Sequence, residues 1–385
     1  MKTHYNQSFD IIIIGAGFTG CALAYQFSKA KAKTLLLESS TPCSGTSAAC
    51  AGRVQVIESE TKEYLKIVKE GFQKIPTVEE ELNVDLEWEI PGHLTLLFSE
   101  KDLNLYEVKV EQMHSLGLEA ENLDPTTLQK LEPYIDLNNC IGAVRSVEGH
   151  INPFNFCFGY LNAARQHQAT ILTNQKVIGF ETKSKKITAV HTQNNVFYAN
   201  KIILATGAWT AQIGNLLNID IPIRYTKAEA MVSEPIVKVL NHHIGTSGFY
   251  KSVHGDEKSV TLGVGQHPNG SLIISNAITP TNEIDRTSSA WGPPSISHEF
   301  KKVFPKLDSL NVMRTWSAPS PFAKDFLPVI GWLPQFENVY LAAAFHLAIP
   351  TIPLFSEKIS NHIMDIENNV AAIFLEPYSP SRFFR

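Results

Sequence analysis

Short apolar runs alternate with polar segments along the whole chain, and the first group of them is the clearest. Residues 9–14 read FDIIII, an apolar run with the length and isoleucine content of a fully buried strand. Apolar side chains at Ala22–Ala24 and Phe27 mark a helix, and a second apolar run, TLLL, occupies 34–37. Residues 9–39 are therefore predicted to form a strand–helix–strand unit.

The turn between the first strand and the helix carries Gly15, Gly17 and Gly20 in the spacing G-x-G-x-x-G. In this motif the first glycine permits a tight turn, the second lets a pyrophosphate approach the backbone, and the third lets helix and strand pack closely. The phosphates then meet the free N–H groups of a helix N-terminus. Glu38 follows 18 residues after Gly20, close to the separation of about 20 at which a carboxylate binds ribose hydroxyls. The unit predicts a dinucleotide site that repels a 2′-phosphate; a βαβ unit without a nucleotide is the alternative.

Later segments follow the same two patterns. They predict helices at 58–72, 101–116, from 125, 154–167, 297–304 and 355–366, and strands at 92–98, 170–172, 177–180, 186–190, 196–198, 201–207, 221–233 and 339–343. Short strands are expected within 239–290, with turns at Gly245 and at Asn269-Gly270. Residues 314–331, which contain three prolines, are predicted to be irregular. Strand-rich insertions thus interrupt the nucleotide-type segments, which predicts one domain inserted into another.

Composition narrows the class of protein. The 385 residues are 44% apolar and 18% charged, as in a globular protein long enough for two domains, and the net charge of −5 offers no basic surface to nucleic acid. The five cysteines include no C-x-x-C pair, which fits a reducing compartment and gives no zinc site. No stretch reaches the roughly 20 apolar residues that cross a bilayer, and the first eight residues have no signal core. We expect a cytoplasmic protein without a metal.

Several further motifs carry a resemblance. The chain reads GTSAACAG at 45–52, GHINPF at 149–154, ATGAWT at 205–210, KAEAMVSEP at 227–235, LPVIG at 327–331 and YSPSRFF at 378–384. In their order and spacing, together with the first unit, these motifs resemble the FAD-dependent amino-acid and amine oxidoreductases of the D-amino-acid oxidase type, nearly end to end. That group includes glycine oxidase, sarcosine oxidase and the flavin subunits of opine oxidase and hydrogen cyanide synthase.

The resemblance implies an α/β fold with a discontinuous Rossmann-like FAD-binding domain and an inserted α+β substrate domain. The substrate domain would be built on a mixed, largely antiparallel sheet that covers the flavin. We expect the FAD-binding domain at 1–80, 140–215 and 320–385, and the substrate domain at 81–139 and 216–319.

The resemblance also implies which residues hold FAD. The expected contacts are Gly15, Ala16, Gly17, Phe18, Thr19 and Gly20 at the pyrophosphate, Glu38 and Ser39 at the adenosine ribose, Thr46 and Ser47 at phosphate or ribitol, Ala51 and Gly52 at the isoalloxazine, Val177 at the adenine, and Ala205, Thr206, Gly207, Trp209 and Gly331 over the dinucleotide. Thr46 and Ser47 are also typical of a helix N-cap, and Val177 of an ordinary core strand. Because no cysteine lies in 314–331, where some relatives attach flavin, we expect FAD to be non-covalent.

Two positions depart from the family pattern. Members that bind an amino-acid carboxylate usually carry an Arg where this chain has Ser320, before Pro321. Since the bidentate fork of an Arg is missing there, we expect poor turnover of small free amino acids. The family loop after the last strand is rich in glycine, whereas residues 342–353 read AAAFHLAIPTIP. This loop is expected to stand away from the flavin, with a lower reduction potential and looser FAD.

Three polar side chains are candidates for the substrate site. Arg53 follows the flavin-facing Gly52 and could meet an anion, with a surface or phosphate-binding Arg as the alternative. Tyr250 lies where family members place a substrate Tyr, with a packed aromatic as the alternative. His346 lies in the altered loop, with a structural His as the alternative.

The expected function is removal of hydride from the carbon next to nitrogen in an amino acid, amine or opine-like substrate, because flavin supplies that reactivity. The alternative is a flavin-binding subunit of a hetero-oligomeric oxidoreductase with weakened or lost catalysis of its own. A partner subunit and a peripheral membrane surface are the further contacts that the family suggests. The substrate and the electron acceptor do not follow from the sequence.

Overall fold

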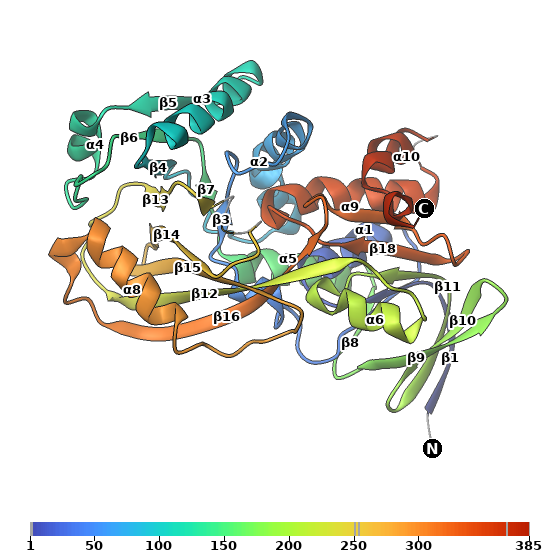
Figure 1. Cartoon of the computed structure of the whole chain (residues 1–385). Helices are drawn as coiled ribbons and strands as arrows, with labels where there is room; N and C mark the ends of the chain where they lie inside the picture. Colours follow the sequence, from blue (N-terminus) through green and yellow to red (C-terminus); the bar gives the residue numbers. More distant parts are fainter. Residues whose placement is uncertain (1–2, 250–251, 253–254, 367–368, 385) are drawn as a thin grey trace.

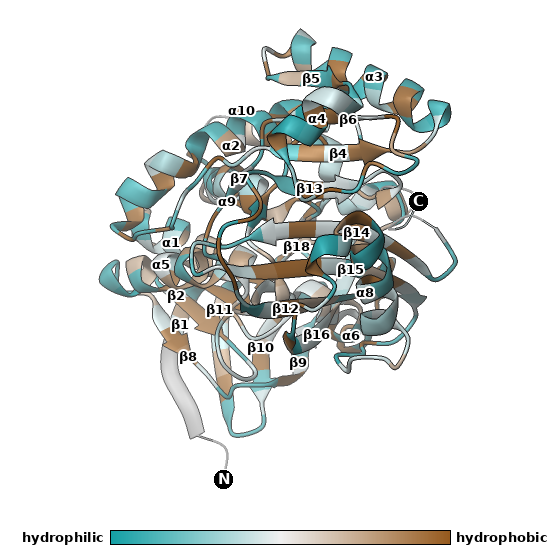
Figure 2. Ribbon diagram, turned by 90° about the vertical axis from the view of Figure 1, so that its left-hand side faces the viewer, coloured by the Kyte–Doolittle hydropathy of each residue, from teal (hydrophilic) through white to brown (hydrophobic). Residues whose placement is uncertain are grey.

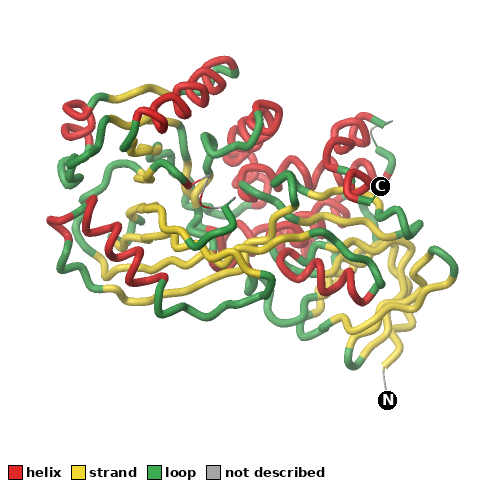
Figure 3. Tube along the Cα trace, in the orientation of Figure 1, coloured by secondary structure: helices red, strands yellow, loops and turns green. Residues whose placement is uncertain are grey.

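Two mixed sheets form the frame of the molecule, and they lie side by side in Figures 1 and 3. This computed structural model describes residues 3–249, 252, 255–366 and 369–384. The first sheet has the order β17 (Val329–Trp332), β18 (Val339–Ala343), β11 (Asn195–Leu204), β1 (Thr3–Ile14), β2 (Thr34–Leu37) and β8 (Thr170–Leu172), and β10 (Lys186–Thr192) joins β11 to β9 (Val177–Lys183).

β1 lies in the middle of the first sheet and pairs in parallel with both β11 and β2. Ile11 and Ile13 pack into the core that contains the helices, whereas Ile12 and Ile14 pack into a second core on the opposite face. Successive side chains of a strand point to opposite faces, so an unbroken isoleucine run suits a sheet that is covered on both sides. Figure 2 shows this strand and its neighbours in the brown of apolar residues.

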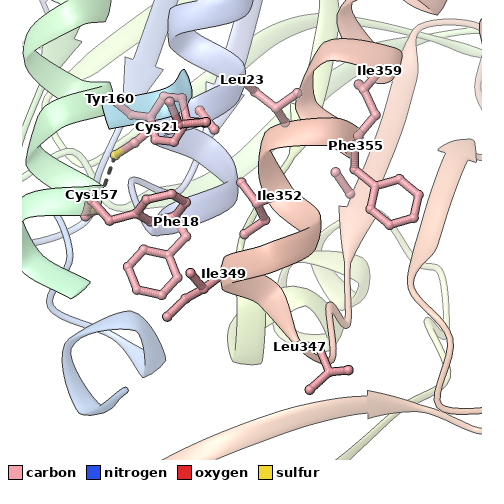
Figure 4. Close-up of a cluster of buried hydrophobic side chains, with 14 of the residues drawn as sticks. Phe18, Cys21, Leu23, Cys157, Tyr160, Leu347, Ile349, Ile352, Phe355 and Ile359 are labelled. Atoms are coloured by element: carbon pink, nitrogen blue, oxygen red, sulfur yellow. Dashed lines mark hydrogen bonds between the residues drawn. The ribbon is translucent and has the colours of Figure 1, made fainter. Parts of the chain in front are cut away.

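Three helices cover one face of this sheet: α1 (Phe18–Lys29), α5 (Pro153–Gln166) and α9 (Ala348–Met364). Figure 4 shows Phe18 of α1, Tyr160 of α5 and Ile352 of α9 converging between the helices. A fourth helix, α2 (Lys62–Leu82), packs on α9. The strand–helix–strand unit predicted for residues 9–39 is therefore confirmed.

The second sheet has the order β16 (Val312–Ala323), β12 (Ile223–Pro235), β15 (Ser271–Thr281), β14 (Ser259–Gln266), β13 (His243–Thr246), β4 (His93–Leu97), β6 (Gly142–Ser146) and β5 (Ala120–Leu123). Its described pairs are antiparallel apart from β13 with β4. The helix α8 (Gly292–Val303) packs Ile296 and Phe300 against this sheet, and α3 (Glu100–Ser115) and α4 (Pro125–Leu131) lie beside β5 in Figure 1. The predicted fold class, a Rossmann-like part with a mixed and largely antiparallel second sheet, is confirmed.

One strand was predicted wrongly as irregular. Residues 312–323 form β16, which pairs antiparallel with β12 along its whole length. Prolines are tolerated in a sheet on an edge strand, where the missing N–H group would face outward. β16 is such an edge, so Pro319 and Pro321 do not interrupt its pairing.

Other boundaries also differ from prediction. The strands predicted at 196–198 and 201–207 are one strand, β11, and Gly245 lies within β13 rather than in a turn. α2 begins at Lys62 because the Thr61 side chain accepts a hydrogen bond from the N–H of Tyr64 and caps the helix. α9 begins at Ala348, before the predicted start at 355.

The two sheets also cross the predicted domain limits. β6 belongs to the second sheet although it follows residue 140, and β16 continues beyond residue 320. The remaining elements are β3 (Arg53–Val54), which pairs with β7 (Gly149–His150), the helices α6 (Thr210–Leu216) and α10 (Val370–Leu375), and the short 3-10 helix η1 (Thr46–Ala49). In the part of the chain that the structure describes, no helix has both the length and the apolarity to cross a membrane.

Candidate active site

A cavity of about 680 Å³ is lined by residues of both sheets. At one end it meets the turn after β1 and Glu38 at the end of β2. At the other end it meets Arg53 and His346. Its walls also come from β12, β15 and β16 of the second sheet.

The turn after β1 has no room for side chains at its glycines. Gly15 has a φ of +102°, which is a glycine conformation, and a Cβ built there would lie 2.6 Å from the carbonyl oxygen of Ala205. A Cβ at Gly20 would lie 1.8 Å from the carbonyl oxygen of Gly15. Gly17 is the N-cap residue of α1, so the first N–H groups of this helix face the cavity end without intrahelical partners. This is the cradle that a pyrophosphate requires.

Glu38 is already held by backbone donors. Its Oε2 accepts a hydrogen bond from the N–H of Ala16 at 2.8 Å, and its Oε1 accepts one from the N–H of Ser40 at 2.8 Å. The side chain therefore stays fixed at the cavity wall, and the remaining lone pairs of its oxygens can accept ribose hydroxyls.

Most of the predicted cofactor residues line the cavity. They are Gly15, Ala16, Gly17, Phe18, Thr19, Glu38, Ser39, Thr46, Ser47, Ala51, Val177, Ala205, Thr206, Gly207 and Trp209. Gly20, Gly52 and Gly331 are not part of the lining: Gly20 packs under the turn, Gly52 against Ile151, and Gly331 against Pro380. Thr46 donates its hydroxyl to the carbonyl of Pro319 at 2.7 Å, and Ser47 Oγ accepts from the N–H of Phe18 at 3.2 Å. Neither caps η1, whose N-cap is Gly45.

The loop that was expected to stand away from the flavin lines the cavity instead. Residues 342–349 all contribute to the wall. Ala344 and Leu347 adopt φ values of 57° and 51°, so two non-glycine residues take the left-handed conformation, and α9 begins directly after Leu347. Because the first turn of a helix leaves its N–H groups without intrahelical partners, this helix start offers donors and a positive dipole end to the cavity. The expectation was wrong because a φ near 55° is accessible to residues other than glycine.

His346 is held from two sides. Its Nδ1 contacts Oε1 of Glu60, and its carbonyl accepts a hydrogen bond from the Tyr64 hydroxyl at 2.7 Å. The ring packs edge-on against Phe322 with a centroid distance of 5.7 Å. The other oxygen of Glu60 is buried and has no hydrogen-bond partner among the described residues. The imidazole thus has a fixed position at the cavity wall.

Arg53 forms a buried ion pair beside the cavity. Its Nε donates to Oε1 of Glu148 at 2.7 Å and its Nη2 donates to Oε2 at 3.0 Å. Glu148 also contacts Nδ1 of His243 at 2.7 Å and is 1% exposed. Burial alone would raise the pKa of Glu148, but the positive charge of Arg53 outweighs it and holds that pKa below its usual value.

Neighbouring histidines are buried in their neutral form. Burial lowers the pKa of His93 and of His150 to about 3, and that of His267 to about 4. His150 stacks edge-on against His267 with a centroid distance of 4.3 Å. Although histidines and a carboxylate gather here, no group of three or more metal-ligating side chains within the described residues is arranged to hold a metal ion.

The remaining sequence-predicted positions fall in two groups. Ser320, where relatives carry an Arg, lines the cavity from β16. Tyr250 lies outside the described residues. The sequence analysis missed Glu60, Glu148, His93 and Asn276, because each is contributed by a separate segment and no local motif marks it.

The residues present fit FAD. The glycine turn would hold the pyrophosphate, Glu38 would bind a ribose, and the wall from Ala51 to the start of α9 would border the ring system. Cys50 lines this wall, and burial raises the pKa of its thiol to about 11. A protonated thiol is a poor nucleophile, which fits a flavin that is not attached to it.

Comparisons with known proteins agree with this geometry. A family model described as FAD dependent oxidoreductase (DAO) matches residues 10–360. Glycine oxidase from Bacillus subtilis is 25% identical over 96% of this chain and 95% of its own length. The hydrogen cyanide synthase subunit HcnC from Pseudomonas aeruginosa is 22% identical over 98% of this chain and 97% of its own length.

Solved structures share the fold over the whole chain. The crystal structure of L-proline dehydrogenase from P. horikoshii has a TM-score of 0.86 at 22% identity and covers 98% of both chains. Glycine oxidase from Geobacillus kaustophilus also has a TM-score of 0.86, at 20% identity, and covers 97% of this chain and 98% of its own. With a family match that spans most of its length, and a glycine turn, a fixed Glu38 and one cavity that fit the cofactor, this chain belongs to the DAO family of FAD-dependent oxidoreductases.

Proposed function

We propose that this FAD-dependent oxidoreductase oxidises the carbon–nitrogen bond of an amino acid, amine or opine-like compound in the cavity between its two sheets. The observation that supports this most directly is the continuity of the cavity. One space joins the glycine turn and Glu38 to Arg53 and His346. A dinucleotide bound at one end would therefore place its ring system against the polar side chains of the other end.

Each part of the chain has a distinct task in this proposal. The α1 N-terminus and Glu38 bind the dinucleotide, and the start of α9 offers donors to the ring. His346, fixed by Glu60 and Tyr64, orients the substrate or the ring. When FAD is bound, it supplies the two-electron acceptor for hydride from the substrate carbon next to nitrogen. Ser320, Phe322 and neighbouring side chains of the second sheet cover this region and exclude water.

The test is anaerobic bleaching of the purified yellow protein. We expect a panel of amines, amino acids and opine-like compounds to include at least one that removes the flavin absorption band. Acid precipitation should leave all colour in the supernatant, because the flavin is non-covalent. Colour in the pellet would contradict the non-covalent part, and protein that takes up no FAD would contradict the function as a whole.

A second candidate is a flavin-binding subunit of a larger oxidoreductase. Two relatives, HcnC and the sarcosine oxidase subunit beta from Rhizobium meliloti, are named as subunits, and they align with 98% and 89% of this chain. A protein that binds FAD but is bleached by no compound until a partner is added would favour this second candidate.

A further inference from the structure

Three polar groups converge on the space in front of Gly263 in β14. A Cβ built at this glycine would lie 3.1 Å from Ser275 Oγ, 3.2 Å from Asn276 Nδ2 and 3.4 Å from Arg53 Nη1. Arg53, Ser275 and Asn276 all line the large cavity. Because Gly263 has no side chain, the space between these polar atoms stays open to a ligand in the cavity.

Arg53 has donors left for such a ligand. A guanidinium carries five N–H donors. Nε and Nη2 use theirs on Glu148 and on Nδ1 of His93, which lies 2.8 Å from Nη2. An Arg does not deprotonate, so His93 accepts at Nδ1, in agreement with its neutral state. Nη1 has no hydrogen-bond partner among the described residues, and its two N–H groups remain.

Glu148 fixes the direction in which these donors point. Its two oxygens bind Nε and Nη2 side by side, which holds the guanidinium plane, and His243 holds the carboxylate in turn. Nη1 is the nitrogen that this arrangement leaves free, and it faces the side-chain amide of Asn276 and the hydroxyl of Ser275 across the gap at Gly263. The donors are therefore arranged before any ligand arrives.

We propose that Arg53, Asn276 and Ser275 bind a carboxylate group of the amine substrate, with Glu148 as the residue that positions Arg53. This inference rests on the proposed function, because it names the substrate class of the same cavity. A carboxylate accepts several hydrogen bonds at two oxygens, which matches a guanidinium edge, an amide and a hydroxyl. The receptor replaces the Arg that relatives carry at the position of Ser320, and it lies on different strands.

The test uses inhibitor-like probes that need no turnover. FAD-loaded protein is titrated with acetate and benzoate, and in parallel with acetamide and benzamide, while the flavin spectrum is recorded. We expect saturable spectral changes with the carboxylates, and at least tenfold weaker binding of the amides. Gly263→Ala places a methyl group between the three polar atoms, and Asn276→Leu removes one donor. Each should weaken carboxylate binding about tenfold, with bound FAD and Tm kept near the wild-type values.

Further variants separate the roles. Arg53→Met leaves Glu148 buried without its cation and can unfold the protein, so the Gly263 and Asn276 variants decide the question if it does. Arg53→Lys keeps the charge without the fork and should bind carboxylates at least tenfold more weakly than wild type. Glu148→Gln should weaken carboxylate binding and leave amide binding unchanged, whereas a purely structural role would weaken both alike. Gly179→Ala, at a glycine with no atom within 4 Å of the added Cβ, is the matched control.

Two results would overturn the receptor. One is equal binding of carboxylates and amides by the wild-type protein. The other is wild-type carboxylate binding by both the Gly263 and the Asn276 variants. Either result is compatible with bleaching of the flavin by uncharged amines, which would leave the proposed function standing. Failure of the proposed function would instead appear as absence of bound FAD or of any bleaching.

Discussion

The turn after β1 and the loop before α9 both lie on the wall of the same cavity, and both contain left-handed backbone. The first uses Gly15, at a φ of +102°, whereas the second uses Ala344 and Leu347, at 57° and 51°. A φ near +55° is open to L-residues at a cost of about 1–2 kcal/mol. A φ near +100° is a glycine conformation, and at Gly15 the carbonyl of Ala205 also occupies the space of a Cβ.

The difference shows when a missing glycine matters. A glycine is required where backbone conformation and space both exclude a side chain, as at Gly15. It is replaceable where the backbone stays in the ordinary left-handed region and the Cβ finds room, as at Ala344, which is buried among apolar residues of the second core. The glycine-free loop is therefore no sign of a damaged flavin site, and the reason to expect a lowered reduction potential falls away.

The largest effect should come from Gly15→Ala. The added methyl group would press on a backbone oxygen at 2.6 Å in a φ region that alanine avoids. Forced overpacking costs about 1–3 kcal/mol or more, and we place this case at the upper end, roughly a hundredfold in FAD affinity. Flavin fluorescence titration measures it, with Gly179→Ala as control. Wild-type affinity in the variant would show that this turn does not touch the cofactor.

Glu38→Gln should come next. The carboxylate accepts from Ala16 and Ser40 and, in the proposal, from a ribose hydroxyl. Hydrogen bonds to charged groups contribute about 1.5–3 kcal/mol, so the dissociation constant of FAD should rise by that amount. The variant should leave carboxylate binding at the other end of the cavity intact once FAD is saturating. An unchanged FAD affinity would remove Glu38 from the site.

The histidines beside Arg53 should make stability depend on pH. The folded protein holds His93 and His150 at a pKa of about 3 and His267 at about 4, whereas an unfolded histidine has a pKa of about 6.5. Between pH 4.5 and 6.5 the unfolded chain binds protons that the folded chain refuses. The free energy of unfolding should therefore fall on acidification, by about 1.4 kcal/mol per pH unit for each such histidine.

Urea unfolding at pH 6.5, 5.5 and 4.5 measures this slope. His267→Asn should reduce it by the share of one histidine, and the exposed His298, changed to Asn, is the control. Glu148 stays ionised through this window because Arg53 lowers its pKa. A slope that His267→Asn does not change would mean that this ring is not held neutral in the fold.

The smallest effect should come from Ala344→Gly. It removes the cost of a left-handed alanine but adds flexibility to the unfolded chain, so stability should change by about 1 kcal/mol or less. FAD retention through gel filtration and the midpoint of a redox titration should match those of the wild-type protein. A clear gain in FAD affinity or a raised midpoint would restore the view that glycine is needed in this loop.

The sequence was informative where one short segment makes a whole site. Gly15, Gly17, Gly20 and Glu38 belong to one local unit, whose conformation and spacing are set by neighbours in the chain. Their positions could be predicted because phosphate binding depends on backbone N–H groups and local turns. Helix boundaries were missed where a cap such as Thr61 competes with apolar periodicity.

The other end of the cavity could not be predicted in the same way. Arg53 comes from β3, His93 from β4, Glu148 from the turn between β6 and β7, and Asn276 from β15. Only the pairing of the sheets brings these segments together. Arg53 and His346 could be named as candidates, but their partners Glu148 and Glu60 could not, since no spacing in the chain records a contact across it.

The prolines of β16 have a consequence for how the protein behaves among copies of itself. An unpaired strand at the margin of a sheet is a template for pairing with another chain, which leads to aggregation. β16 pairs with β12 on one side only, and Pro319 and Pro321 remove N–H groups at alternate positions of its other side. The Thr46 hydroxyl already occupies the carbonyl of Pro319. This margin therefore cannot build a regular hydrogen-bonded ladder with an incoming strand, and at high concentration it should resist strand addition.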